Sequence, residues 1–230
     1  MLKPGLYIVS TPIGNLKDIT LRAISVLGEV DIIACEDTRR SKVLLNYYKI
    51  KKPLISFNDH NKERRTPELI KRMKKGESIA LISDAGTPGI SDPGFYLIRE
   101  TIREGLEIVP IPGPSALLSG LVVSGLPCDR FVFEGFLPKR EGRKKKRLEA
   151  LKYEPRTMVF YESPHRLIRT LEDMLSIFSD REVAIARELT KKFEEVMRGR
   201  ISELLPQLED GKIKGEVVLI VEGYEGEDKR

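Results

Sequence analysis

The stretch that decides the fold runs from Ile79 to Gly94 and reads IALISDAGTPGISDPG. Its first four residues are apolar, a run long enough for a buried strand and too short for a helix. A loop rich in glycine and proline follows, and then an apolar-periodic segment of helical spacing. Open α/β sheets bind ligands at the carboxyl ends of their strands, where glycine lets the backbone approach the ligand closely. The stretch therefore predicts a strand, a ligand-binding loop and a helix, with Asp84 at the strand tip.

The loop matches neither of the common nucleotide-binding motifs. The chain contains no G-x-x-x-x-G-K-[ST] sequence, and Gly86, Gly89 and Gly94 do not have the G-x-G-x-x-G spacing. Glycine-proline clusters also mark ordinary turns, so the loop alone leaves open a plain connection between a strand and a helix.

The composition is that of a folded globular protein. The chain has 230 residues, 40% of them hydrophobic and 33% charged, which fits one large domain or two small ones. Two cysteines, Cys35 and Cys128, are too few for a disulfide framework and indicate thiols in a reducing compartment. With only His60 and His165 and no C-x-x-C motif, we expect no metal site.

The sequence also predicts a cytoplasmic protein without a membrane segment. The N-terminus lacks the basic-then-apolar pattern of a signal peptide. The longest apolar-rich segment, 116–126, is too short and too rich in glycine to span a bilayer.

The positive charge is concentrated in one run. Residues 138–147, PKREGRKKKR, hold seven basic residues and one acidic residue, so the rest of a chain of net charge +5 sums to about −1. Such a run, expected here as a loop, is either a solvated segment or an arm that contacts the phosphates of a nucleic acid. It contains no aromatic residue, so it is expected to position a nucleic-acid backbone and not to stack on bases. The predicted nucleic-acid contacts are Lys139, Arg140, Arg143, Lys144, Lys145, Lys146 and Arg147.

Strands and helices alternate up to residue 111, which predicts a mostly parallel sheet. The expected strands are 5–9, 31–35, 53–57, 79–82 and 107–111, and the expected helices are 19–30, 41–50, 66–75 and 95–104. The third helix is expected to start at Thr66-Pro67-Glu68, with a capping hydroxyl and a proline at the first helical position.

Four of these strands end in loops suited to ligands. The loops are 10–15, 36–40, 83–94 and 112–116, and at one edge of a parallel sheet they would define a cleft. Pro112-Gly113-Pro114 is a stiff kink, so we expect domains at 1–112 and 113–230. The second domain has expected strands at 130–134, 156–161, 182–187 and 217–221, and a helix from 163 to about 178.

Eight segments of the chain together resemble one known family, the 16S ribosomal RNA (cytidine 2′-O) methyltransferases of the tetrapyrrole-methylase superfamily. The resemblance covers nearly all of residues 5–223. The segments are YIVSTPIGNLKDIT (7–20), ACEDTR (34–39), FNDHN (57–61), ISDAGTPGISDPG (82–94), IPGPSA (111–116), FYESPHR (160–166), ARELTKKFEE (186–195) and KGEVVLIVEG (214–223).

The resemblance implies two α/β domains with S-adenosylmethionine (SAM) held in a cleft between them, and a homodimer. Many members of the family continue beyond the equivalent of Arg230 with a further small segment. The cofactor-binding residues that it implies are Pro12, Asp84, Thr87, Ser115, Ala116, Tyr161, Glu216 and Val217.

The implied reaction is methylation of the 2′-hydroxyl of a cytidine in 16S ribosomal RNA, with the assembled small subunit as the expected partner. A ribose hydroxyl is a poor nucleophile, so a base or a positive environment should assist it. The catalytic candidates are Glu36, Arg187, Glu188 and Lys191, although Glu36 can instead pair with Arg39, and Arg187 with Glu188. Two alternatives stay open: a methyltransferase for a tetrapyrrole-like small molecule, and an RNA-binding protein of the same fold without activity.

Overall fold

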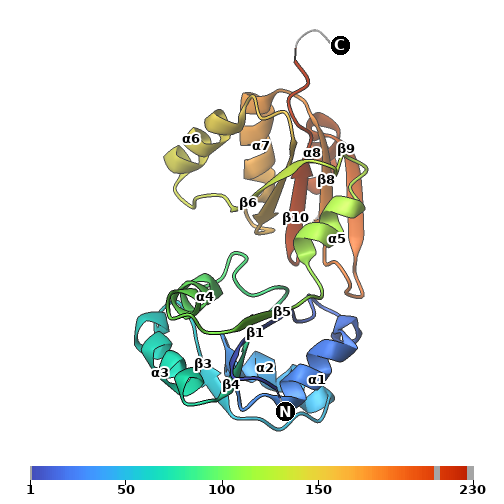
Figure 1. Ribbon diagram of the computed structural model, residues 1–230. Coiled ribbons are helices and arrows are strands. Elements are labelled where there is room, and N and C mark those ends of the chain that lie inside the picture. The colour runs from blue at the N-terminus through green and yellow to red at the C-terminus, as the bar shows by residue number, and fades with distance from the viewer. Residues whose placement is uncertain (1, 210–212, 227–230) are drawn as a thin grey trace. The chain divides into compact units, whose positions relative to one another are not determined.

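The computed structural model describes residues 2–209 and 213–226 and divides the chain into two compact units, Met1–Ser115 and Ala116–Arg230 (Figure 1). The boundary that the sequence predicts after residue 112 lies three residues before this division.

The first unit contains a five-stranded sheet in which every strand pair is parallel, as the alternation of strands and helices predicts. The order of the strands across the sheet is β3-β2-β4-β1-β5. Strands β1, β2 and β4 are buried along their whole length, which is typical of parallel strands covered on both faces. The strands are β1 (Gly5–Val9), β2 (Ile32–Cys35), β3 (Leu54–Ser56), β4 (Ser78–Ile82) and β5 (Ile108–Ile111).

Helices cover both faces of this sheet, which makes a three-layer α/β unit. Leu27 and Leu44, from α1 and α2, share one hydrophobic cluster with Val9 of the sheet. Leu69 and Leu97, from α3 and α4, belong to a second cluster on the opposite face. The helical elements are a short 3₁₀ turn, η1 (Leu16–Asp18), and the helices α1 (Leu21–Glu29), α2 (Thr38–Tyr47), α3 (Lys62–Lys74) and α4 (Gly94–Arg103).

The predicted start of α3 at Thr66 is wrong, because the helix begins at Lys62 and Pro67 lies inside it. The Thr66 hydroxyl donates to the carbonyl oxygen of Lys62 (2.8 Å) and does not cap the helix. Proline lacks an N–H, so the carbonyl of Glu63 receives no helical hydrogen bond, but Glu63 is exposed in the first turn, where water serves the same purpose.

The second unit is built on a mixed sheet in the order β6-β7-β10-β8-β9. Strands β6 and β7 are parallel, and the three other neighbouring pairs are antiparallel. Its strands are β6 (Phe131–Phe136), β7 (Thr157–Glu162), β8 (Glu182–Arg187), β9 (Glu195–Arg200) and β10 (Val217–Val221). Its helices are α5 (Ala116–Val122), α6 (Glu141–Leu151), α7 (Leu167–Phe178) and α8 (Ile201–Glu209).

The two faces of this sheet are covered differently (Figure 1). Helices α6, α7 and α8 contribute Leu148, Leu171 and Leu204 to one large hydrophobic cluster. On the opposite face α5 lies against β10 and approaches it closely at Gly120, where a Cβ would come within 2.9 Å of a methyl carbon of Val218. A glycine at this position therefore allows the helix to sit on the strand.

The basic run is not a loop, because most of it belongs to helix α6. Lys144, Leu148 and Leu151 lie four and three residues apart and are the buried residues of this helix. Helix α7 also differs from its prediction: it starts at Leu167, after a turn that contains Ser163 and Pro164.

Across residues 2–209 and 213–226, we find no helix with both the length and the apolar content needed to cross a membrane.

Candidate functional site

The four loops expected at strand ends lie at one edge of the first sheet, because all of its strands run in the same direction. The loops after β1 and β4 are joined directly. Thr11 and Gly86 exchange two backbone hydrogen bonds (2.9 and 3.0 Å), and the hydroxyls of Ser10 and Thr87 are 2.9 Å apart. Gly86 has φ +80°, a conformation that favours glycine. The edge is therefore a connected structure that holds Thr87 beside the end of β1.

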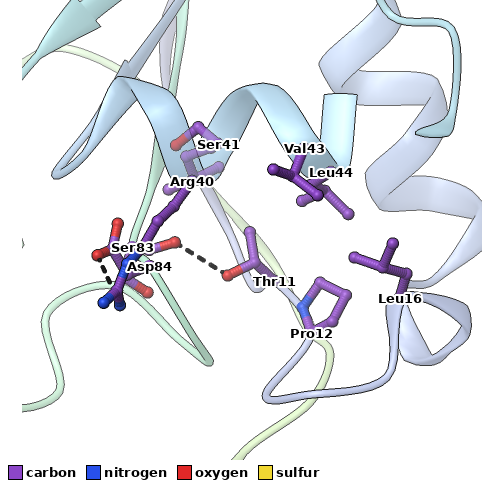
Figure 2. Close-up of a pocket in the computed structure, with 10 residues that line it drawn as sticks. Thr11, Pro12, Leu16, Arg40, Ser41, Val43, Leu44, Ser83 and Asp84 are labelled. Atoms are coloured by element: carbon purple, nitrogen blue, oxygen red, sulfur yellow. Dashed lines mark hydrogen bonds and ion pairs between the residues drawn. The ribbon is translucent and has the colours of Figure 1, made fainter. Parts of the chain in front are cut away.

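A pocket of about 260 Å³ opens at this edge between the two loops and α2 (Figure 2). Its apolar side contains Pro12, Leu16 and Leu44, while Arg40 and Asp84 lie together on the polar side. The Thr11 hydroxyl donates to the backbone carbonyl of Ser83 (3.0 Å) and so fixes the wall between them.

Asp84 lies at the tip of β4, where the sequence predicts it. One carboxylate oxygen accepts a hydrogen bond from the backbone N–H of Asp37 (3.2 Å), and the other is 3.3 Å from the Arg40 guanidinium. The Asp84 side chain is 23% exposed and that of Arg40 is 70% exposed. An ion pair to so exposed a cation contributes little, so the backbone contact is what orients the carboxylate.

Two further carboxylates make this edge acidic. Burial, followed by the charges of Asp92 and Asp84, raises the pKa of Glu36 to about 7. Burial also raises the pKa of Asp92, although its carboxylate accepts hydrogen bonds from the N–H groups of Gly89 (2.8 Å) and Gly94 (2.7 Å). A Cβ at Gly94 would lie 2.7 Å from an Asp92 oxygen, so the loop requires glycine there.

The alternative that Glu36 simply pairs with Arg39 is not what the structure has. The described residues contain no ion pair between them, and the Arg39 backbone N–H donates to Asp37 (2.7 Å) at the start of α2. Glu36 is thus a half-buried carboxyl that makes no ion pair with Arg39.

In the second unit, three predicted residues form one network. The Lys191 ammonium lies 2.8 Å from Glu188 and 3.0 Å from Glu216, and Glu188 also accepts from the Glu216 backbone N–H (3.1 Å). Burial lowers the pKa of Lys191, but its bonds to the two carboxylates outweigh that effect and raise the pKa. The bond from Lys191 likewise lowers the pKa of Glu188. Glu188 has φ +50° and Thr190 has φ +66°, left-handed conformations that cost non-glycine residues energy.

The remaining predicted residues of the second unit have structural partners. Arg187 pairs with Glu195 (2.5 Å) and not with Glu188. Tyr161 lies in β7, with its side chain hydrogen bonded to the backbone of Leu117. Ala116 is the first residue of α5, directly after Ser115, and Val217 is a buried residue at the start of β10.

The seven basic residues predicted to contact RNA do not share one environment. The prediction for Lys144 is wrong, because its side chain is only 5% exposed and pairs with Asp173 of α7. Arg147 makes two 2.7 Å bonds to Glu134, and Lys145 is 3.5 Å from Glu141. The other four are exposed and have no ion pair within the described residues; they are Lys139, Arg140, Arg143 and Lys146. We call these four the exposed cations of α6, although Lys139 and Arg140 directly precede the helix.

In the part of the chain that the structure describes, no group of three or more His, Cys, Asp and Glu side chains could hold a metal ion.

Comparison with known proteins identifies the family. A sequence model of the family described as Tetrapyrrole (Corrin/Porphyrin) Methylases matches residues 5–205. The chain belongs to this family. A relative of this chain, ribosomal RNA small subunit methyltransferase I of Thermotoga maritima, is 53% identical over 96% of this chain and 99% of its own length. The Bacillus subtilis protein of the same name is 49% identical over 97% of this chain and 76% of its own length.

Solved structures bear out the predicted fold class. Uroporphyrin-III C-methyltransferase from Thermus thermophilus, complexed with S-adenosylhomocysteine, superposes with a TM-score of 0.67 at 17% sequence identity. The match covers 95% of this chain and 97% of that chain, and at this identity it shows the fold alone.

Sequence reasoning missed Arg40 and Asp92 as members of the acidic edge. Asp92 lies inside the quoted loop, and its Asp-Pro-Gly sequence is a turn signal. The local sequence could therefore have indicated its hydrogen bonds to two backbone N–H groups. No local sequence signal indicated Arg40, because its ion pair with Asp84 joins residues that are far apart in the chain.

Proposed function

We propose that this protein transfers a methyl group from SAM to the RNA of the small ribosomal subunit, and that the acceptor is a cytidine 2′-hydroxyl. The observation that carries the proposal is the 53% identity to a ribosomal RNA small subunit methyltransferase over nearly the full length of both chains. Likeness to tetrapyrrole enzymes supports the fold but not a small-molecule acceptor, since the identity there is 17%.

The acidic edge of the first unit fits the chemistry of SAM, which supplies an electrophilic methyl group on a positively charged sulfur. Carboxylates of Glu36, Asp84 and Asp92 give this edge a negative field suited to a cation and to ribose hydroxyls. Pro12 belongs to the loop after β1 and Thr87 to the loop after β4, where glycine permits close backbone approach. The other cofactor contacts that we propose are Ser115, Ala116, Tyr161, Glu216 and Val217.

The reaction breaks the sulfur–methyl bond and forms an oxygen–methyl bond, while the hydroxyl proton passes to a base. A carboxyl whose pKa is about 7, such as Glu36, accepts a proton at neutral pH. Lys191, fixed between Glu188 and Glu216, offers a positive charge that stabilises an oxygen as it loses its proton. Arg187 lies at the end of β8, next to Glu188, and adds to this positive field.

The exposed cations of α6 support an RNA acceptor, because a small polycarboxylate needs no extended basic face. Arg143 and Lys146 lie three residues apart on α6, so the helical spacing places them near one another, and Lys139 precedes the helix in the chain. Such a face contacts phosphates without reading sequence. The homodimer and the cytoplasmic location that we expect belong to the same proposal.

The test is methyl transfer from labelled SAM to three acceptors: small ribosomal subunits from cells that lack the modification, naked 16S RNA, and a tetrapyrrole precursor. We expect label in RNA, at one cytidine linkage that resists alkali, since a 2′-O-methyl group blocks alkaline cleavage. Label on the tetrapyrrole alone would refute the RNA assignment. Binding of RNA without binding of SAM would refute the enzymatic assignment.

A further inference from the structure

Three aromatic side chains gather at the end of β6 and β7 in the second unit. The Tyr161 ring lies 5.0 Å from that of Phe133 and 5.5 Å from that of Phe136, centroid to centroid, in edge-on and tilted arrangements. Phe136 is 60% exposed, whereas Phe133 and Tyr161 are partly buried. A phenylalanine this exposed gains little from folding, and its ring face is available for a contact outside the chain.

A β-bulge puts Phe136 in this position. The pairing of β6 with β7 runs regularly to Phe133, skips Glu134, and resumes with Gly135 opposite Phe160 and Phe136 opposite Tyr161. Without the extra residue, the alternation of side chains would send Phe136 to the face that α6 and α7 cover. Gly135, at φ +63°, allows the bulge.

Glu134 follows Phe133 and, by ordinary alternation, faces the other side of the sheet, where it holds Arg147 of α6 through two 2.7 Å bonds. The bulge therefore lies between the residue that holds the basic helix and the residue that joins the aromatic cluster. Bulges that redirect side chains are common next to functional sites.

The support beneath Phe136 is fixed. The hydrogen bond to the Leu117 backbone and the edge contact with Phe133 restrain Tyr161. Arg166 donates to the carbonyls of Leu137 (3.2 Å) and Pro138 (3.1 Å), the two residues that lead from Phe136 to the basic run. Phe136 is therefore a preorganised platform and not a side chain on a loose loop.

Two basic residues follow Phe136 closely in the chain. Lys139 and Arg140 come three and four residues after Phe136, within about 15 Å even for a fully extended chain. Both are exposed and belong to the exposed cations of α6. An aromatic ring next to unpaired positive charge is the arrangement that binds single-stranded nucleic acid: the ring stacks on a base and the cations hold the neighbouring phosphates.

We propose that Phe136 stacks on a base of the RNA substrate while Lys139 and Arg140 hold the adjacent phosphates. This inference rests on the proposed function for its substrate and extends it from backbone contacts to a base contact. A base held in this way is unstacked from its neighbours, which gives access to its ribose.

Tryptophan fluorescence tests the stacking directly, because the sequence contains no tryptophan. In the Phe136→Trp variant, with SAM present at saturation throughout, we expect a short single-stranded RNA to quench the fluorescence. The matched control is Tyr153→Trp: Tyr153 is 65% exposed and packs edge-on against Tyr224 at 5.1 Å, but it lies beyond the C-terminal end of α6. Absence of quenching by RNA would overturn the proposal, as would equal quenching of both variants.

Methyl-transfer kinetics give a second readout. Phe136→Ala should raise the KM for small ribosomal subunits about 5- to 150-fold, the range expected for the loss of one base–aromatic stack. The KM for SAM and the salt dependence of RNA binding should stay as in the wild type, because stacking carries no charge. Phe136→Trp should restore the wild-type KM, and Tyr153→Ala should leave it unchanged.

The two proposals fail in different ways. Methyl transfer to RNA with unchanged KM in Phe136→Ala and no quenching in Phe136→Trp would refute the platform alone. Quenching by RNA with no methyl transfer to RNA would refute the proposed function and uphold the platform.

Discussion

The acidic edge of the first sheet and the exposed cations of the basic run carry opposite charge in different physical settings. At the edge of the first sheet, Asp84 and Asp92 are partly buried and accept hydrogen bonds from backbone N–H groups. On α6 in the second unit, the exposed cations make no ion pair within the described residues. Charges fixed by the backbone suit a small ligand of defined shape, while exposed long side chains suit a polyanion with many equivalent phosphates. Variants at each site should therefore separate SAM binding from RNA binding.

Lys144 marks the limit of that contrast, because it belongs to the basic run but is buried against Asp173. Lys144→Ala leaves the buried carboxylate of Asp173 with only the more exposed Lys145, 3.6 Å away, and should lower the free energy of unfolding by up to about 3–5 kcal/mol. Denaturant unfolding measures this loss, with Lys146→Ala as the control on the exposed side of the same helix. The control should change stability by less than about 0.5 kcal/mol.

Equal effects of the two alanine variants would mean that Lys144 is solvated in solution, and the basic run would then act as a single surface.

Asp84→Ala should weaken SAM binding about 10- to 150-fold, the range expected for the loss of a charge-assisted hydrogen bond. RNA affinity should not change, because the variant leaves the exposed cations of α6 untouched. Calorimetric titration of SAM and a filter-binding assay with RNA measure the two affinities separately. Asp84→Asn is the matched variant, which keeps an oxygen for the Asp37 N–H (3.2 Å) but loses the charge, and it should fall between.

If Asp84→Ala weakened SAM binding and RNA binding equally, the two ligands would not be bound by separate sites in the two units.

Neutralising exposed cations should affect only RNA binding, and by a smaller factor. If Arg143 and Lys146 each contact one phosphate, RNA affinity in the variant with both changed to Gln should depend less on salt. Its loss of affinity between 50 and 200 mM salt should be smaller than that of the wild type by a factor of about seven. Lys145 and Arg147 are the controls on the same helix, since Glu141 and Glu134 already pair with them. Changing these two to Gln alters net charge equally but should change the salt slope less.

Identical salt slopes for the two double variants would show that α6 acts through its overall charge and not through individual contacts.

Local signals carried most of the prediction for the first unit. A short apolar run followed by glycine and proline marks a buried parallel strand and its loop, so the strands and the shared edge were predictable. The exception is Pro67, where the preference of proline for the first helical position gave the wrong start for α3. An exposed first turn tolerates the missing N–H, and no local rule reports that exposure.

The second unit was less predictable because its features depend on distant partners. The density of charge in the basic run obscured α6, whose buried Lys144 finds Asp173 on another helix. Strand β9 was missed since it is an edge strand with a charged, half-exposed sequence. The bulge that brings Phe136 to Tyr161 is a matter of register between two strands, and the sequence of β6 alone does not reveal it.

The acidic edge also predicts a pH dependence that the cationic helix lacks. Burial and neighbouring carboxylates raise the pKa of Glu36 from 4.5 to about 7. Between these values the unfolded chain has released the proton while the folded protein keeps it, so folding loses stability as pH rises through this window. Glu36→Gln removes the penalty and should be more stable than the wild type above pH 7, by on the order of 1 kcal/mol since the group is partly solvated.

Unfolding at pH 4, 6 and 8 measures the difference, with the exposed Glu63→Gln as control. A constant gap between wild type and Glu36→Gln at all three pH values would show that Glu36 is not held in an acidic, desolvated position, and the contrast between the two units would lose its electrostatic basis.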